Sequence, residues 1–222
     1  IIESSAFENC VALLNNGGSS RVMPLKLVSL GERAFANCRS LAYVNVPKGL
    51  SYISEEAFIN CSALEEMLYD EGGVLTTIKE NAFANCTSLR TAKLPETLAL
   101  KDKDGVYGLV KNPFIGCTRL TAFEFDKENV NKLYVVGGVV YRALTALDGT
   151  VYEYNGENMP KETAIYAFPT AKATTNVVIG SEVSEIDDYA FYGATITGVE
   201  FAKNASEGAV EQTLLVKIGD YA

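Results

Sequence analysis

The five-residue block Ala-Phe-x-Asn-Cys recurs in six copies along the chain, and no other feature of the sequence constrains the fold as strongly. An aliphatic residue stands four positions before each copy, and in the first five copies a leucine stands three positions after the cysteine. The shortest intervals between copies are 23 and 25 residues. A unit this short cannot bury its own apolar side chains, so successive units must stack as the coils of a solenoid. The copies begin at positions 6, 34, 57, 82, 113 and 190, and the last two read Pro-Phe-Ile-Gly-Cys and Ala-Phe-Tyr-Gly-Ala.

Short strands are predicted after the blocks, where apolar and polar residues alternate. Pro47 and Pro95 end two of these segments, because proline has no N–H to donate to a strand ladder. Each coil would add one strand to a parallel sheet, about 4.8 Å from its neighbour. The expected strands lie within residues 41–47, 64–70, 89–95, 120–126 and 196–202.

This pattern resembles the BspA-like leucine-rich repeats of bacterial surface proteins. The A-F-x-N-C block, its I-x-x-x-A-F lead-in and its C-x-x-L exit recur in register over residues 1–126 and 177–222. The resemblance implies a β-rich right-handed solenoid, a leucine-rich repeat array with a parallel concave sheet and short turns or 3-10 segments on the convex side. Residues 133–176 show no clear copy, and they resemble the strand-rich, β-hairpin-type insert of such proteins. We therefore expect 1–222 to be a single solenoid that carries this insert, with both ends cut within a repeat.

The five cysteines hold the same place in their coils and should form one inward column. Their Cβ atoms would point the same way, which opposes disulfide formation. Zinc-type cysteine spacing is absent, and so is histidine. We expect these cysteines to be reduced and to pack as small hydrophobes, with the block's phenylalanines as core and its asparagines bonded to turn backbone. The cysteines are Cys10, Cys38, Cys61, Cys86 and Cys117.

Charge and composition argue against several classes of function. The net charge is −9 and no basic run is present, so neither a nucleic acid nor an anionic membrane surface is an expected partner. No apolar stretch approaches the roughly 18 residues of a membrane span, which argues against direct membrane insertion. Histidine, a nucleophile elbow and a phosphate-binding glycine loop are all missing, so we predict no catalysis, no cofactor and no metal. The adjacent pairs Glu65-Glu66 and Asp187-Asp188 should point to opposite faces and are interpreted as solvated surface.

The side chains that the strands direct away from the core are the candidate binding residues. Solenoids commonly bind partners on the concave sheet, although an ordinary solvated sheet would show the same pattern. The tyrosine-rich segment 134–166 is a second candidate, because tyrosine is enriched at interfaces, unless these rings pack the insert against the solenoid. The candidate residues of the concave face are Tyr43, Asn45, Glu66, Leu68, Arg90, Thr91, Lys93, Glu124 and Glu200.

The family resemblance implies an adhesion or recognition module of a secreted or cell-surface protein. Its partner would be a protein or glycan of unknown identity, such as a host matrix protein, a plasma protein or a macromolecule of another bacterium. The alternative is a passive array that spaces other domains from the cell wall. We expect the chain to be monomeric. Because the first residue is Ile1 rather than methionine, we also expect any signal or anchor to lie outside this segment.

Overall fold

The computed structural model describes residues 1–14, 22–99, 108–125, 127, 129, 133–136, 138–143, 151–154, 157–160, 163–171, 176–180, 183–201 and 217–222. These residues form strands joined by turns, and they include no helix. The strands are β1 (Tyr43–Val46), β2 (Tyr52–Ile53), β3 (Glu66–Tyr69), β4 (Thr77–Ile78), β5 (Thr91–Leu94), β6 (Gly108–Leu109), β7 (Ala122–Phe125), β8 (Leu133–Val136), β9 (Val139–Ala143), β10 (Val151–Tyr154), β11 (Glu157–Pro160), β12 (Thr163–Ala167), β13 (Val177–Ile179), β14 (Val183–Ile186), β15 (Val199–Phe201) and β16 (Lys217–Ile218).

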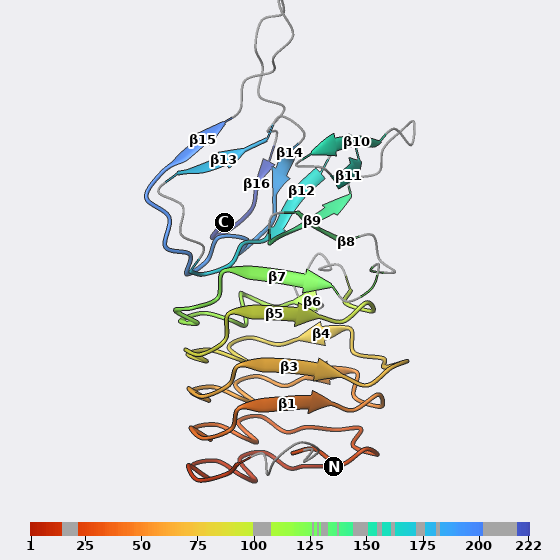
Figure 1. Ribbon diagram of the computed structural model, residues 1–222, viewed down its shortest axis with the longest axis vertical. Helices are drawn as coiled ribbons and strands as arrows, with labels where there is room; N and C mark the ends of the chain where they lie inside the picture. Colours follow the sequence, from red (N-terminus) through yellow and green to blue (C-terminus); the bar gives the residue numbers. More distant parts are fainter. Residues whose placement is uncertain are drawn as a thin grey trace, which may run out of the picture.

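The coils stack along the long axis of the molecule, from the N-terminal coil at the bottom of Figure 1 upward. Four successive coils each contribute a four-residue strand, and these pair in parallel as β1 with β3 and β5 with β7. Each of these strands, and β15, lies inside a predicted segment, which confirms those predictions. A second parallel stack, β2–β4–β6, was not predicted. It forms because the lead-in residues Ile53, Ile78 and Leu109 lie in register.

The phenylalanines of the block form a stacked column through the core, as expected. Their ring centroids are 5.1–5.4 Å apart from Phe7 to Phe114, with interplanar angles below 10°. Phe35, Phe58, Phe83 and Phe114 are at most 1% exposed, whereas Phe7 at the first coil is 39% exposed. Phe123 meets Phe114 edge-on at 5.6 Å. An offset stack of this kind adds to the free energy of burial.

Two residues in each repeat have left-handed backbone, one just before the block and one inside it, and they make the turn that carries Phe inward. The residue before the alanine has positive φ in every copy, from Ser5 (57°) to Tyr189 (59°). The fourth residue of the block also has positive φ, as at Asn60 (60°) and Gly116 (73°). Asparagine and glycine tolerate this conformation best. The block therefore carries Asn or Gly at its fourth position for a conformational reason.

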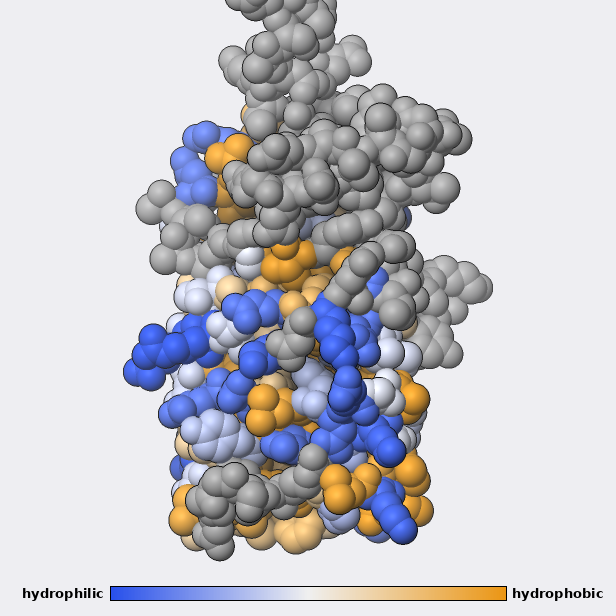
Figure 2. Space-filling view, turned by 45° about the vertical axis from the view of Figure 1, so that its right-hand side comes forward, coloured by the Kyte–Doolittle hydropathy of each residue, from blue (hydrophilic) through white to orange (hydrophobic). Residues whose placement is uncertain are grey.

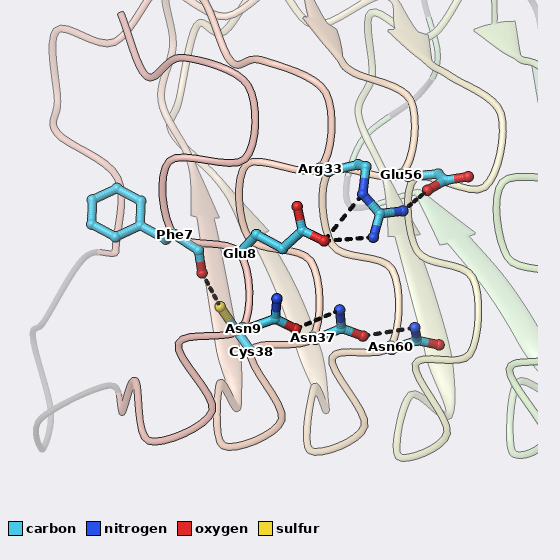
Figure 3. Close-up of polar contacts among 8 residues, drawn as sticks. All are labelled: Phe7, Glu8, Asn9, Arg33, Asn37, Cys38, Glu56 and Asn60. Atoms are coloured by element: carbon cyan, nitrogen blue, oxygen red, sulfur yellow. Dashed lines mark hydrogen bonds and ion pairs between the residues drawn. The ribbon is translucent and has the colours of Figure 1, made fainter.

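The polar side chains of the block bond between coils, as Figure 3 shows for the first three. The Asn37 side-chain amide donates to Asn9 Oδ1 and that of Asn60 to Asn37 Oδ1, each at 2.9 Å. Asn85 continues this amide ladder to Asn60 at the same distance. The ladder differs from the predicted bonding to turn backbone, because equivalent asparagines lie one coil apart and face each other.

The cysteine column forms as predicted, and the described cysteines are free thiols. Four are buried, and Cys10 in the first coil is exposed. Each buried thiol also donates to the carbonyl of the phenylalanine in the preceding coil, as Cys61 Sγ does to Phe35 O at 3.2 Å. The same contact joins Cys38 to Phe7 at 3.2 Å. The interpretation as a purely apolar residue was therefore incomplete, since the S–H group is a second donor to a carbonyl that already accepts from a backbone N–H, as Phe35 O does from Cys38 N.

A further, shortened copy of the repeat lies inside the segment where the sequence pattern shows none. The Phe168 N–H donates to the Ala190 carbonyl at 2.8 Å, as the phenylalanines of the first four blocks do to the next coil. The Phe168 ring packs against Phe191 at 4.8 Å. Ile165 pairs with Ile186 as a lead-in residue, but it stands two positions before Ala167 instead of four. The missing residues remove the spacing by which a copy is recognised.

Extra strands join the upper coils, as expected of an insert. The hairpin β8–β9 and strand β12 are antiparallel neighbours, and β12 continues in parallel to β14 and β16. Together they form a five-stranded mixed sheet above β7 in Figure 1. Strands β10 and β11 form a separate antiparallel hairpin. The sheet rests on the solenoid, because the Phe123 N–H donates to the Gly138 carbonyl at 2.9 Å.

Candidate interaction surface

The outward side of β1, β3, β5 and β7, here called the outer sheet face, carries most of the predicted binding residues. Strand alternation explains why these side chains face outward, because Val44, Met67 and Ala92 point into the core and are fully buried. Their neighbours therefore point outward, and Tyr43 is 42% exposed. The parallel register sets Tyr43 beside Glu66 and Lys93 beside Glu124. One row of side chains thus crosses four coils.

A shallow groove of about 510 Å³ lies on this face. Six of the predicted residues line it, which brings together positions from coils up to 81 residues apart. The remaining three lining residues are Glu65, Ser88 and Arg119. The predicted lining residues are Tyr43, Glu66, Arg90, Thr91, Lys93 and Glu124.

Charges of both signs surround the groove, and only part of them is paired. Lys93 Nζ lies 2.9 Å from Glu66 Oε1, with both side chains partly exposed. The guanidinium groups of Arg90 and Arg119 form no ion pair with any other described residue. A free guanidinium offers a fixed fork of donors that suits carboxylates and phosphates. The groove can therefore accept an anionic group beside Tyr43 and the ion pair.

Sequence reasoning left out Ser88 and Arg119 as candidates. Both belong to the C-x-x-L exit, one position before the core leucines Leu89 and Leu120. Both line the groove from the turn that precedes their strand. Polar residues just before that leucine are the signal that could have identified them. Glu65 also lines the groove together with Glu66, so the expectation of opposite faces is wrong for this pair, because β3 begins only at Glu66.

Three predicted residues lie outside the groove. Asn45 and Leu68 are paired in register on the outer sheet face but do not line the cavity. Glu200 lies on β15, whose partner is β13 rather than β7. This two-stranded sheet stands apart from the lower stack, at the upper left of Figure 1. Glu200 Oε1 accepts a bond from Asn176 at 3.0 Å, so the structure does not bring Glu200 to the other candidates.

The described tyrosines of the second candidate segment are buried. Tyr141 is 7% exposed and Tyr166 is fully buried. The Tyr166 hydroxyl donates to the Ala99 carbonyl at 3.0 Å and accepts from the Leu109 N–H at 3.2 Å. Tyr166 packs the insert against the solenoid core, and Tyr141 belongs to a second buried cluster with Ile165 and Phe168. Of the two alternatives for these two rings, the structure therefore favours packing over a binding surface. The side chains of Tyr134, Tyr152 and Tyr154 lie outside the described residues.

Three of the buried thiols, Cys38, Cys61 and Cys86, are held in their protonated form. Burial raises the pKa of the Cys38 thiol to about 11 and that of Cys61 to about 12, with a smaller contribution from neighbouring thiols. The pKa of Cys86 is raised by the same cause. A thiolate is the form that attacks electrophiles or binds metals. The described residues also contain no group of three or more His, Cys, Asp or Glu side chains that could hold a metal ion.

Comparison with known families decides the assignment. The model of the BspA type leucine rich repeat region matches residues 1–134 and 158–212, in six copies. The chain belongs to the BspA-type leucine-rich repeat family. The second matched range includes the shortened copy at Ala167-Phe168 that the sequence pattern missed. Comparison with curated proteins finds no match.

Solved structures of bacterial leucine-rich repeat proteins share the fold of this BspA-type chain. The pneumococcal vaccine antigen PcpA aligns with a TM-score of 0.60 and 22% identity, over 86% of this chain and 39% of PcpA. A leucine rich cell surface protein from Faecalibacterium prausnitzii aligns with a TM-score of 0.59 and 19% identity, over 99% of this chain and 54% of that one. A leucine-rich repeat protein from Eubacterium ventriosum aligns with a TM-score of 0.52 and 17% identity, over 87% of this chain and 47% of that one. This BspA-type chain thus spans about half of these proteins or less.

A search of the described residues for membrane-spanning segments found no helix that is long and apolar enough to cross a bilayer.

Proposed function

We propose that this BspA-type array is a protein-interaction module of a secreted or cell-surface protein, and that it binds its partner through the outer sheet face. The observation that carries the proposal is the groove of about 510 Å³, whose lining comes from four coils. Family membership and the likeness to bacterial leucine-rich repeat proteins support the general role. The partner would be a protein or glycan with an anionic group, because Arg90 and Arg119 form no ion pair within the described part of the chain.

Solid-phase binding with a matched pair of variants tests this proposal. The folded protein would be passed over immobilised host matrix and plasma proteins and bacterial-surface glycans. The variant Tyr43→Ala/Arg90→Ala removes one aromatic and one cationic side chain from the groove. The control Tyr52→Ala/Lys79→Ala removes the same classes from the β2–β4 stack, where Lys79 Nζ lies 4.5 Å from the Tyr52 ring centre.

Saturable binding that the groove variant loses and the control keeps would support the outer sheet face. Truncating a central aromatic or arginine at an interface commonly costs 2 kcal/mol or more, which is a loss of about thirtyfold or greater. Equal losses in both variants would overturn the assignment to this face. A folded protein that binds nothing in the panel would favour the alternative function, a structural array that spaces other domains.

A further inference from the structure

A second, more apolar groove of about 240 Å³ lies at the ends of the outer strands. We call it the strand-end groove. Its floor is apolar and includes the ends of β1 and β5, where Val46 and Leu94 are at most 2% exposed. The strand-end groove shares no lining residue with the groove on the outer sheet face. Its charged lining residues are Asp70, Glu71, Glu96 and Lys127.

The sequence of one coil builds the wall of this groove. Leu50 and Leu98 each follow the last strand residue by four positions, whereas Leu75 follows Tyr69 by six. The extra residues make the turn after β3 protrude at the right of Figure 1. Gly72 has a φ of 69° at this turn, and no atom lies within 4 Å of the position that a Cβ would take. The turn therefore projects into open space at this residue. Figure 2 turns the right-hand side of the molecule forward and shows hydrophilic and hydrophobic side chains interspersed over the lower coils.

An ammonium group of the chain itself already sits between two carboxylates of the groove. Lys127 Nζ lies 3.4 Å from Glu71 Oε1 and 4.0 Å from Glu96 Oε2. Asn129, two residues further along the chain, is buried, and its amide donates to the Leu98 carbonyl at 3.1 Å. The Lys127 side chain is 56% exposed and that of Glu71 is 90% exposed. Exposed ion pairs of this kind contribute about 1 kcal/mol or less, so another cation can replace Lys127.

We infer that the strand-end groove binds a basic side chain, lysine or arginine, from a polypeptide partner. The aliphatic stem of that side chain would pack against the partly exposed Tyr69 ring, which lines the groove together with the buried Val46 and Leu94, while its charged head takes the position of the Lys127 ammonium. Long cationic side chains bury their stems on apolar surfaces in this way and keep the head at polar groups. The lining holds three carboxylates and one cation, so its charge complements a basic partner.

Fluorescence anisotropy with a labelled peptide tests this inference. The probe is Gly-Ser-Arg-Leu-Lys-Ser-Gly, and its counterpart carries glutamine in place of Arg and Lys. We expect saturable binding of the basic peptide only. The variant Glu71→Gln/Glu96→Gln should weaken it about tenfold. Lys127→Ala should tighten it about threefold, because the internal competitor is gone. The control Glu32→Gln/Glu55→Gln removes two exposed carboxylates that do not line the groove, and it should bind as the wild type does.

Three results would each overturn the inference. The first is no binding of the basic peptide, and the second is an equal loss of affinity in the control variant, which would mean unspecific attraction to an acidic protein. The third is weaker binding after Lys127→Ala, which would make Lys127 a ligand contact rather than a competitor. The inference is independent of the proposed function, since the Tyr43→Ala/Arg90→Ala variant should leave binding of this peptide unchanged.

Discussion

Replacing one ring of the phenylalanine column should reveal how much the stacked core contributes to stability. Phe58 is fully buried and stacks on Phe35 and Phe83, each at 5.3 Å. Phe58→Ala therefore removes a large apolar side chain from between two rings that the neighbouring coils hold in place. Such Phe→Ala changes cost about 3–5 kcal/mol. The free energy of unfolding of a natural protein is about 5–15 kcal/mol, so the loss would be a large fraction of the total.

Phe7→Ala is the matched comparison within the same column. Phe7 is 39% exposed and has one ring neighbour, Phe35 at 5.1 Å. Phe7→Ala removes less buried apolar area and leaves no enclosed cavity. We therefore expect it to lower the free energy of unfolding by about half as much as Phe58→Ala does.

Urea unfolding measures both losses. The chain has no tryptophan and twelve tyrosines, so far-UV circular dichroism and tyrosine fluorescence are the signals to follow. Non-coincident transitions in Phe58→Ala would show that the coils on its two sides have become uncoupled, as expected of a linear array. Losses that are equal at the two positions, or below about 1 kcal/mol at Phe58, would refute the view that the enclosed column stabilises the solenoid.

Three further predictions concern the thiol and amide rows. The pKa of Cys61 is about 12 in the folded chain against an ordinary 9.0, so this thiol loses its proton in the unfolded chain first. The free energy of unfolding should therefore fall as the pH rises above about 9, by about 1.4 kcal/mol per pH unit for this thiol. Urea unfolding at several alkaline pH values should give a shallower fall in Cys61→Ala. At neutral pH the same Cys61→Ala change should cost about 1 kcal/mol, because the Phe35 carbonyl loses its second donor and keeps only the Cys38 N–H, and thermal unfolding showing no loss would contradict that role. Asn60→Ala should destabilise the chain more than Asn60→Gly, by about 1 kcal/mol, because both lose the ladder but only alanine is strained at a φ of 60°; equal melting temperatures would argue against backbone control at this position.

The groove on the outer sheet face was predictable in part. The alternation within each strand places Tyr43, Thr91 and Lys93 outward, and it needs only local sequence. The depth of the groove and the roles of Ser88 and Arg119 depend on how turns of different coils pack side by side. No local pattern carries that information.

The sequence by itself determined the repeating unit, the outer strands and the buried columns of phenylalanine and cysteine, because equivalent residues recur in register and each coil can bury them only against the next. Tertiary structure alone decided what depends on distances between coils. Stacking turned the asparagines into an amide ladder and gave each buried thiol a carbonyl partner. It also recruited Phe168 as a shortened copy and separated Glu200 from the other candidates, because the extra strands interrupt the stack above β7.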